Sequence, residues 1–265
     1  MCQVRADVST GERVTSRVPS PPVVRYGPHP DQVANLHLPA TEGGPWPCAI
    51  LIHGGFWRER WDRTLMTPLA IDLSSRGYVA WNVEYRRIGQ EGGGWPGTFD
   101  DVTAAADALA EVSEVDLTHL VAVGHSAGGH LALWLGARAH GRVRIRASVS
   151  LAGVADLDAA FRDDLGGGAV AALLGGGPEL VPDRYRHADP AALVPLGARQ
   201  LLVHGGADDI VPPTQSCDYA DKARAAGDDV DLVEMAGADH FDVIDPAHEA
   251  WRVVVDRLPR LLDPS

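Results

Sequence analysis

The sequence predicts an α/β fold in which helices cover both faces of one mostly parallel central sheet. Short apolar runs of strand length alternate along the chain with helical patterns of about 10–15 residues, as expected of parallel βαβ units. The run CAILIHGG at 48–55 is continuously apolar and ends in glycines, which is typical of a strand buried on both faces.

The expected strands are short segments rich in Val, Ile, Leu and aromatic residues, bounded by glycine, proline or polar turn residues. The first two are joined by the turn-rich PHPDQ, and we expect them to be antiparallel. The others alternate with helical segments, so we expect most of them to be parallel. In chain order, the expected strands cover 23–27, 33–39, 48–55, 78–85, 120–126, 147–154, 200–206 and 230–237.

The expected helices carry apolar residues at helical spacing. The first stops at Gly77, a typical residue just after a helix C-terminus, and the second has Thr98 at a position suited to capping its N-terminus. The third is the Ala/Leu-rich segment AGGHLALWLGARAH, which directly follows a strand. In chain order, the expected helices cover 65–77, 98–112, 127–140, about 214–226 and about 247–262.

The chain is expected to form one domain preceded by an arm. Residues 1–21 are polar and end among prolines, so we expect a flexible N-terminal arm followed by a single domain at 22–265. Residues 156–198 interrupt the alternation with two GGG triplets, several prolines and only short helical pieces. Because long irregular segments in compact domains are commonly functional, we interpret this segment as a short cap insertion over the site.

Composition excludes several classes of function. The 265 residues carry 36 acidic and 23 basic side chains, whereas phosphate binding needs clustered Lys and Arg, so we expect no nucleic-acid partner. No apolar stretch approaches the roughly 20 residues that span a bilayer, and the N-terminus lacks the apolar core of a signal peptide. Cys2, Cys48 and Cys217 form no CxxC pair, which fits reduced thiols. We therefore expect a cytoplasmic protein that has no membrane partner.

The strongest chemical signal is Gly124-His125-Ser126-Ala127-Gly128, a G-x-S-x-G motif located where a buried strand must turn sharply into a helix. The glycines let the chain fold tightly around a strained serine, which then projects its hydroxyl group above the end of the sheet. The pentapeptide alone occurs by chance, but its strand–turn–helix context is the one that the motif requires. We therefore predict that Ser126 is a nucleophile.

His240 is the candidate base. A serine hydroxyl needs a base to remove its proton, and in sheets of this kind the acid and then the base follow the nucleophile, each after a strand end. His240 follows the strand expected at 230–237 and satisfies this order. The other histidines that we considered lie too close to the serine, precede the acid or fall within the last helix: His125, His130, His204 and His248.

The candidate acid lies in HGGADDIVP, after the strand expected at 200–206. Asp208 and Asp209 both qualify. We favour Asp208, the first residue of D-x-x-V-P, and keep Asp209 as the alternative. The acid would hold the imidazole in the correct tautomer and stabilise its protonated form.

The segment His53-Gly54-Gly55-Phe56-Trp57 comes after the apolar strand residues CAILI and is the candidate oxyanion loop. Acyl transfer develops a negative oxygen that needs preorganised N–H donors, and paired glycines leave backbone amides open to a substrate. We expect the amides of Gly55, Phe56 and Ala127 to form the oxyanion hole. The segment Tyr85-Arg86-Arg87 is a candidate support for this loop.

The motifs HGGFW, GHSAGG, HGGADDIVP and GADHF, in this order and at these strand ends, resemble those of the α/β-hydrolase superfamily. HGGxW in particular resembles the kynurenine formamidase (arylformamidase) group and related small carboxylesterases. The resemblance covers nearly the whole chain from about residue 23. It implies a metal-independent hydrolase of a small ester or N-formyl amide, with Ser126 as nucleophile, Asp208 as acid and His240 as base.

We therefore predict a serine hydrolase that cleaves a small carboxylic ester through a Ser–His–Asp triad. One alternative is an N-formylkynurenine formamidase, and another is a non-catalytic α/β-hydrolase that only binds a small molecule. Because HExxH and a cysteine cluster are missing from the sequence, and neither GGG triplet of residues 156–198 is followed by GK[ST], we expect no metal or nucleotide cofactor. Aromatic residues near predicted strand ends could line the pocket or simply pack in the core: Trp57, Trp61, Trp95 and Phe241.

Overall fold

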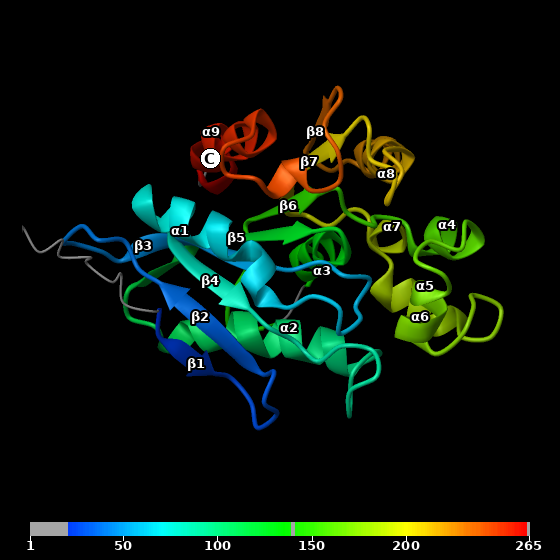
Figure 1. Cartoon of the computed structure of the whole chain (residues 1–265), viewed down its shortest axis with the longest axis horizontal. Coiled ribbons are helices and arrows are strands. Elements are labelled where there is room, and N and C mark those ends of the chain that lie inside the picture. The colour runs from blue at the N-terminus through cyan, green and yellow to red at the C-terminus, as the bar shows by residue number, and fades with distance from the viewer. Residues whose placement is uncertain (1–20, 139–140, 264–265) are drawn as a thin grey trace, which may run out of the picture.

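The computed structural model of the chain describes residues 21–138 and 141–263, and within them one eight-stranded sheet runs through the molecule (Figure 1). The strands lie in the order β1-β2-β4-β3-β5-β6-β7-β8. β2 pairs antiparallel with β1 and with β4, and all other neighbours are parallel, which confirms the predicted class of fold. The strands are β1 (Val23–Arg25), β2 (Val33–His37), β3 (Trp46–Ile52), β4 (Val79–Val83), β5 (Val115–His125), β6 (Ala147–Leu151), β7 (Arg199–Gly205) and β8 (Val230–Met235).

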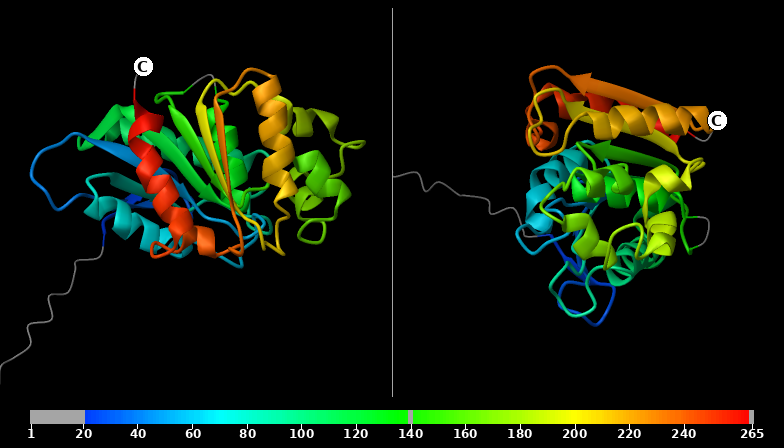
Figure 2. Two further views of the ribbon diagram at one scale, coloured as in Figure 1. Left: turned by 90° about the horizontal axis from the view of Figure 1, so that it is seen from above. Right: turned by 90° about the vertical axis from the view of Figure 1, so that its right-hand side faces the viewer.

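Helices cover both faces of the sheet, as the sequence predicts (Figures 1 and 2). Side chains alternate along β3: Leu51 packs toward α1 and α9, whereas Ile50 packs toward α2 and α3. α8 packs beside α3, on the face of the sheet that α2 and α3 cover. The helices outside the cap segment are α1 (Thr67–Ser75), α2 (Gly97–Ala108), α3 (Ala127–Gly136), α8 (Thr214–Ala225) and α9 (Glu249–Leu262), with short 3-10 turns η1 (Arg63–Met66), η2 (Leu109–Glu111) and η3 (Asp242–Ile244).

The last helix illustrates why the helical pattern is a reliable signal. α9 buries Trp251, Val254, Leu258 and Leu261, which are spaced three or four residues apart and therefore lie on one face. This apolar stripe packs in the same cluster as Leu51 of β3, so α9 closes one face of the sheet.

Two local expectations are wrong. β5 begins at Val115 rather than at residue 120, because Val115 pairs with Trp46 of β3, a contact between distant segments. Thr98 does not cap α2, which already begins at Gly97. Its hydroxyl instead accepts a hydrogen bond from the Gly94 N–H and joins the loop to the helix.

Residues 156–198, the predicted cap segment, form four short helices that gather at one end of the molecule (Figure 2). Apolar residues of the segment, among them Leu157 and Leu173, share a core cluster with α2 and α3. Residues 1–20 of the predicted arm lie outside the described residues. The cap helices are α4 (Leu157–Arg162), α5 (Ala169–Leu174), α6 (Pro182–Ala188) and α7 (Pro190–Leu193).

No helix in the described part of the chain combines the length and the apolar character that crossing a bilayer requires.

Candidate active site

Ser126 occupies the turn between β5 and α3, with backbone angles φ 56° and ψ −119°. A non-glycine residue rarely adopts a positive φ, and strain of this kind is typical of a nucleophile elbow. The two motif glycines are required by close packing. A Cβ atom at Gly124 would lie 1.9 Å from the Gly128 carbonyl oxygen, and one at Gly128 would lie 2.1 Å from the Ile52 carbonyl oxygen.

The structure brings His240 and Asp208 together. His240 Nδ1 lies 2.6 Å from Asp208 Oδ2, and both side chains are buried. Asp208 follows β7 and His240 follows β8, so the parallel sheet delivers both loops to the edge where β5 ends at Ser126. The sequence leaves Asp208 and Asp209 open as the candidate acid. Asp208 is the one in contact with His240, whereas Asp209 is exposed.

Asp208 also has a second imidazole beside it, which sequence reasoning missed. His204 Nε2 lies 3.3 Å from Asp208 Oδ2 and 2.9 Å from the Val211 carbonyl oxygen. The backbone N–H groups of Ile210 and Val211 both donate to Asp208 Oδ1 at 2.9 Å. Burial alone would raise the pKa of Asp208, but the hydrogen bonds from His204, His240 and the Val211 N–H outweigh it and hold that pKa well below its ordinary value.

The ring of His125, the residue before the serine, packs against His240. The two ring centroids lie 4.6 Å apart, and His125 Nε2 lies 2.8 Å from the His240 carbonyl oxygen. Burial, and then the neighbouring His240, lower the pKa of His125 to about 3. A neutral His125 ring therefore donates to the loop that carries His240 and fixes its position.

The candidate oxyanion loop, residues 53–57, packs directly on the turn at Ser126. A Cβ atom at Gly54 would lie 2.8 Å from the His125 carbonyl oxygen and 2.9 Å from Ser126 Cβ, so a larger residue would push the two segments apart. Gly55 and Phe56 both have positive φ, 115° and 52°. This conformation turns the backbone sharply beside the serine.

A buried polar network holds the candidate oxyanion loop in place. The Tyr85 hydroxyl donates to the His53 carbonyl oxygen at 2.9 Å, and the two rings stack with centroids 4.3 Å apart. Sequence reasoning missed Glu84, whose buried carboxylate lies 2.9 Å from His53 Nε2 and accepts the Arg63 N–H at 3.0 Å. The role of Glu84 can be recognised only from the structure, because the sequence does not show that β4 ends beside the candidate oxyanion loop.

Ser126, His240 and the candidate oxyanion loop border a pocket of about 190 Å³. Trp61 and Phe241 line it, as the sequence suggests, with ring centroids 6.1 Å apart. Leu65 and Ile210 add apolar surface that the sequence did not indicate. The complete lining is Gly55, Phe56, Arg58, Arg60, Trp61, Leu65, His125, Ser126, Ile210, His240 and Phe241.

The other two aromatic candidates lie away from the pocket. Trp57 has a positive φ of 56°, which turns it into the core, where it is fully buried and its Nε1 donates to His130 Nδ1 at 3.2 Å. Trp95 packs edge-on against Phe99 of α2 with centroids 4.9 Å apart. Both residues therefore anchor loops, the second of the two alternatives that the sequence leaves open, and neither of these two pocket candidates lines the pocket.

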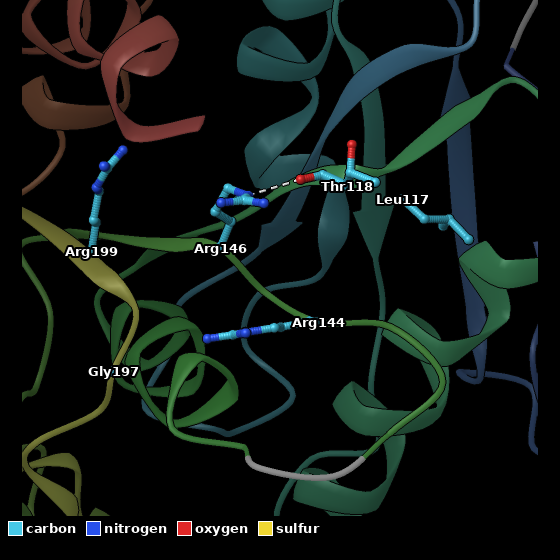
Figure 3. Close-up of a pocket in the computed structure, with 6 residues that line it drawn as sticks. All are labelled: Leu117, Thr118, Arg144, Arg146, Gly197 and Arg199. Atoms are coloured by element: carbon cyan, nitrogen blue, oxygen red, sulfur yellow. Dashed lines mark hydrogen bonds between the residues drawn. The ribbon is translucent and has the colours of Figure 1, made fainter. Parts of the chain in front are cut away.

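A wider hollow of about 420 Å³ lies at the opposite edge of the sheet, where β5, β6 and β7 begin (Figure 3). Its wall carries three arginines, and the Arg146 Nε donates to the Thr118 carbonyl oxygen at 2.9 Å. It contains none of the residues described above. The lining is Leu117, Thr118, Arg144, Arg146, Gly197 and Arg199.

Solved structures share this fold. Esterase B from Lactobacillus Rhamnosis matches with a TM-score of 0.78 at 22% sequence identity, and the match covers 90% of this chain and 83% of that one. A bifunctional GH43-CE protein of Bacteroides eggerthii matches with a TM-score of 0.77 at 22% identity, over 90% of this chain and 37% of that one. The sheet topology and the strained turn at Ser126 define an α/β-hydrolase, which confirms the resemblance seen in the sequence motifs.

The family follows from the sequence comparison. The family model BD-FAE matches residues 34–223, which is more than half of the chain, and the chain belongs to the BD-FAE family. The Probable isoprenylcysteine alpha-carbonyl methylesterase of Arabidopsis thaliana is 26% identical over 252 residues. That match covers 82% of this chain and 56% of the plant protein, so the chain spans about half the length of this relative.

Proposed function

We propose that this α/β-hydrolase is a serine esterase that acts on small carboxylic esters. The observation that carries the proposal is the Asp208–His240 hydrogen bond of 2.6 Å at a pocket that Ser126 also lines. Membership of the BD-FAE family and the esterase fold of the structural neighbours support it. The pocket of about 190 Å³ favours a small group on the substrate.

In the proposed reaction, His240 takes the proton from the Ser126 hydroxyl while the serine oxygen attacks the ester carbonyl carbon. The resulting tetrahedral intermediate collapses, and the protonated His240 gives its proton to the departing alcohol oxygen. A water molecule then attacks the acyl-serine bond by the same steps and releases the acid. Asp208 keeps the imidazole oriented and stabilises its positive charge, without itself taking the proton.

The negative oxygen of that intermediate needs N–H donors, and we assign this role to the backbone amides of Gly55, Phe56 and Ala127. Ala127 is the first residue of α3, whose N-terminus carries partial positive charge. Loss of one such donor typically costs about 3–4 kcal/mol of transition-state stabilisation.

The test is an assay of 4-nitrophenyl acetate beside N-formylkynurenine, with a fluorophosphonate label to mark the nucleophile. We expect turnover of the ester and a covalent adduct on Ser126. Ser126→Ala should lose both while keeping its circular dichroism spectrum, because the side chain is small. Ser113→Ala, an exposed serine on a distant loop, is the matched control and should keep both.

Two other results of these assays would each indicate an alternative function. Turnover of N-formylkynurenine with little ester hydrolysis would make the protein an arylformamidase that uses the same residues. Correct folding with neither turnover nor an adduct, beside a labelled control hydrolase, would contradict the enzyme proposal and leave a small-molecule-binding α/β-hydrolase.

A further inference from the structure

The wall of the pocket has a charge opposite to that of the protein as a whole. The chain has 36 acidic and 23 basic residues, yet the Asp, Glu, Lys and Arg side chains that line the pocket are Arg58 and Arg60 alone among the described residues. Asp239 and Asp242, which lie beside His240 in the sequence, are not among the lining residues, and Asp239 accepts the backbone N–H groups of Phe241 and Asp242. Both guanidinium groups that line the pocket are therefore positive, and no carboxylate lines it.

Arg58 joins the pocket to the cap segment. Its Nη1 and Nη2 donate to the carbonyl oxygens of Gly166 and Gly167, each at 2.8 Å. These acceptors are neutral, so the positive charge of Arg58 is not cancelled. Arg58 thus contributes positive potential while its donors hold the cap in place.

Arg60 is the guanidinium that remains open to a ligand. The side chain is exposed, and its Cζ lies 5.9 Å from the centroid of the Trp61 ring. Within residues 21–138 and 141–263, it lies in no ion pair. The neighbouring backbone is fixed, because the buried Arg87 donates from Nη1 to the Trp61 carbonyl oxygen at 2.7 Å.

We propose that the esters hydrolysed at this site carry a carboxylate, and that Arg60 binds this group at the mouth of the pocket. The proposal rests on the esterase function proposed above and names its substrate class. A guanidinium presents paired N–H donors that match the two oxygens of a carboxylate. Trp61 and Phe241 would hold the apolar part of the ester between Arg60 and Ser126, since all four line the same pocket.

The test measures kcat/KM for two pairs of esters with wild-type protein and with Arg60→Gln. In the first pair the carboxylate is on the leaving group: 4-acetoxybenzoate against its methyl ester. In the second pair it is on the acyl group: mono-4-nitrophenyl adipate against 4-nitrophenyl hexanoate. We expect the anionic-to-neutral ratio of one pair to fall about threefold to tenfold in Arg60→Gln, chiefly through KM, as for a partly exposed charge pair. The affected pair identifies which half of the ester carries the carboxylate.

Arg144→Gln is the matched control. It removes an exposed arginine from the hollow at the opposite edge of the sheet (Figure 3) and so changes the net charge equally. Ratios that stay unchanged in Arg60→Gln, or that fall as much in Arg144→Gln, would overturn the proposal. A different result would contradict the proposed esterase function itself: the wild-type protein would hydrolyse none of the four esters and take up no fluorophosphonate.

Discussion

Asp208 and Asp209 are neighbours in the sequence, but their side chains have different surroundings. Asp208 is buried between the imidazoles of His204 and His240, whereas Asp209 is exposed. Asp208→Asn would replace a charge acceptor with a group that can hold the wrong imidazole tautomer. We expect kcat for 4-nitrophenyl acetate to fall by about 10⁴-fold, as in other triads. The measurement is steady-state kinetics.

Asp209→Asn is the control for this prediction, because it makes the same chemical change one residue away. We expect it to retain kcat within about twofold, since substitutions at exposed positions have small effects. Equal losses in both variants, with native circular dichroism spectra, would contradict the assignment of Asp208.

The order of the motifs in the sequence predicts Ser126 and His240 and favours Asp208 as neighbours in one candidate site, because parallel strands bring their C-terminal ends to one edge of the sheet. It was insufficient for His204. That histidine precedes the acid along the chain, and its contact with Asp208 depends on how the loop after β7 folds back toward the strand. Arg60 was equally undetectable, because an exposed arginine becomes informative only when its neighbours are known.

Among the elements, the cap segment and the candidate oxyanion loop are joined by Arg58. Arg58→Gln would remove its two charged hydrogen bonds to the carbonyl oxygens of Gly166 and Gly167. We expect amides around 164–168 to exchange hydrogen about tenfold faster, which corresponds to roughly 1.4 kcal/mol of lost local stability. Hydrogen exchange followed by mass spectrometry measures this, and KM for 4-nitrophenyl acetate should rise.

Arg162→Gln serves as the control for the cap. Arg162 is an exposed arginine of α4 that pairs with Asp158, so its loss should leave exchange at 164–168 unchanged. Unaltered exchange in Arg58→Gln would contradict the role of Arg58 in holding residues 164–168.

The elements that the sequence predicted best are those with their own periodicity. α9 and the buried strands were located to within a few residues, because α9 must be apolar on one face and the buried strands on both. The early start of β5 was missed, since polar residues separate Val115 from the apolar run that begins at residue 120, and Val115 pairs with Trp46 only in the folded sheet. The sequence could not decide between the pocket and the core for Trp57, because the positive φ values of the loop turn it inward and no residue pattern reports such angles.

For the whole molecule, the buried Asp189 links stability to pH. It accepts the Leu157 N–H at 3.0 Å and the Ala191 N–H at 3.1 Å, and so joins α7 to the start of α4. Burial raises the pKa of Asp189 to about 7, above its value in the unfolded chain. The folded protein therefore binds this proton more readily, and the resulting stability is full below about pH 4 and is lost as the pH rises through 7.

Asp189→Asn removes this ionisation and keeps an oxygen acceptor. We expect the variant to melt on the order of 5 °C higher than wild type at about pH 8, with the difference shrinking toward about pH 5. Thermal unfolding monitored by circular dichroism at several pH values measures it. Asp183→Asn, an exposed aspartate of α6, should show no such trend. A constant difference at all pH values would show that Asp189 does not ionise in this range.

The contact between Gly54 and the turn at Ser126 has a consequence for the modularity of the protein. β3 and β5 are adjacent in the sheet, so the segments that leave them touch although more than 70 residues separate them in the chain. An engineer who replaces the HGGFW loop with that of another α/β-hydrolase must replace the GHSAG turn with it. Chimeras that exchange one segment alone should express as folded but inactive proteins, whereas those that exchange both should recover the donor's selectivity.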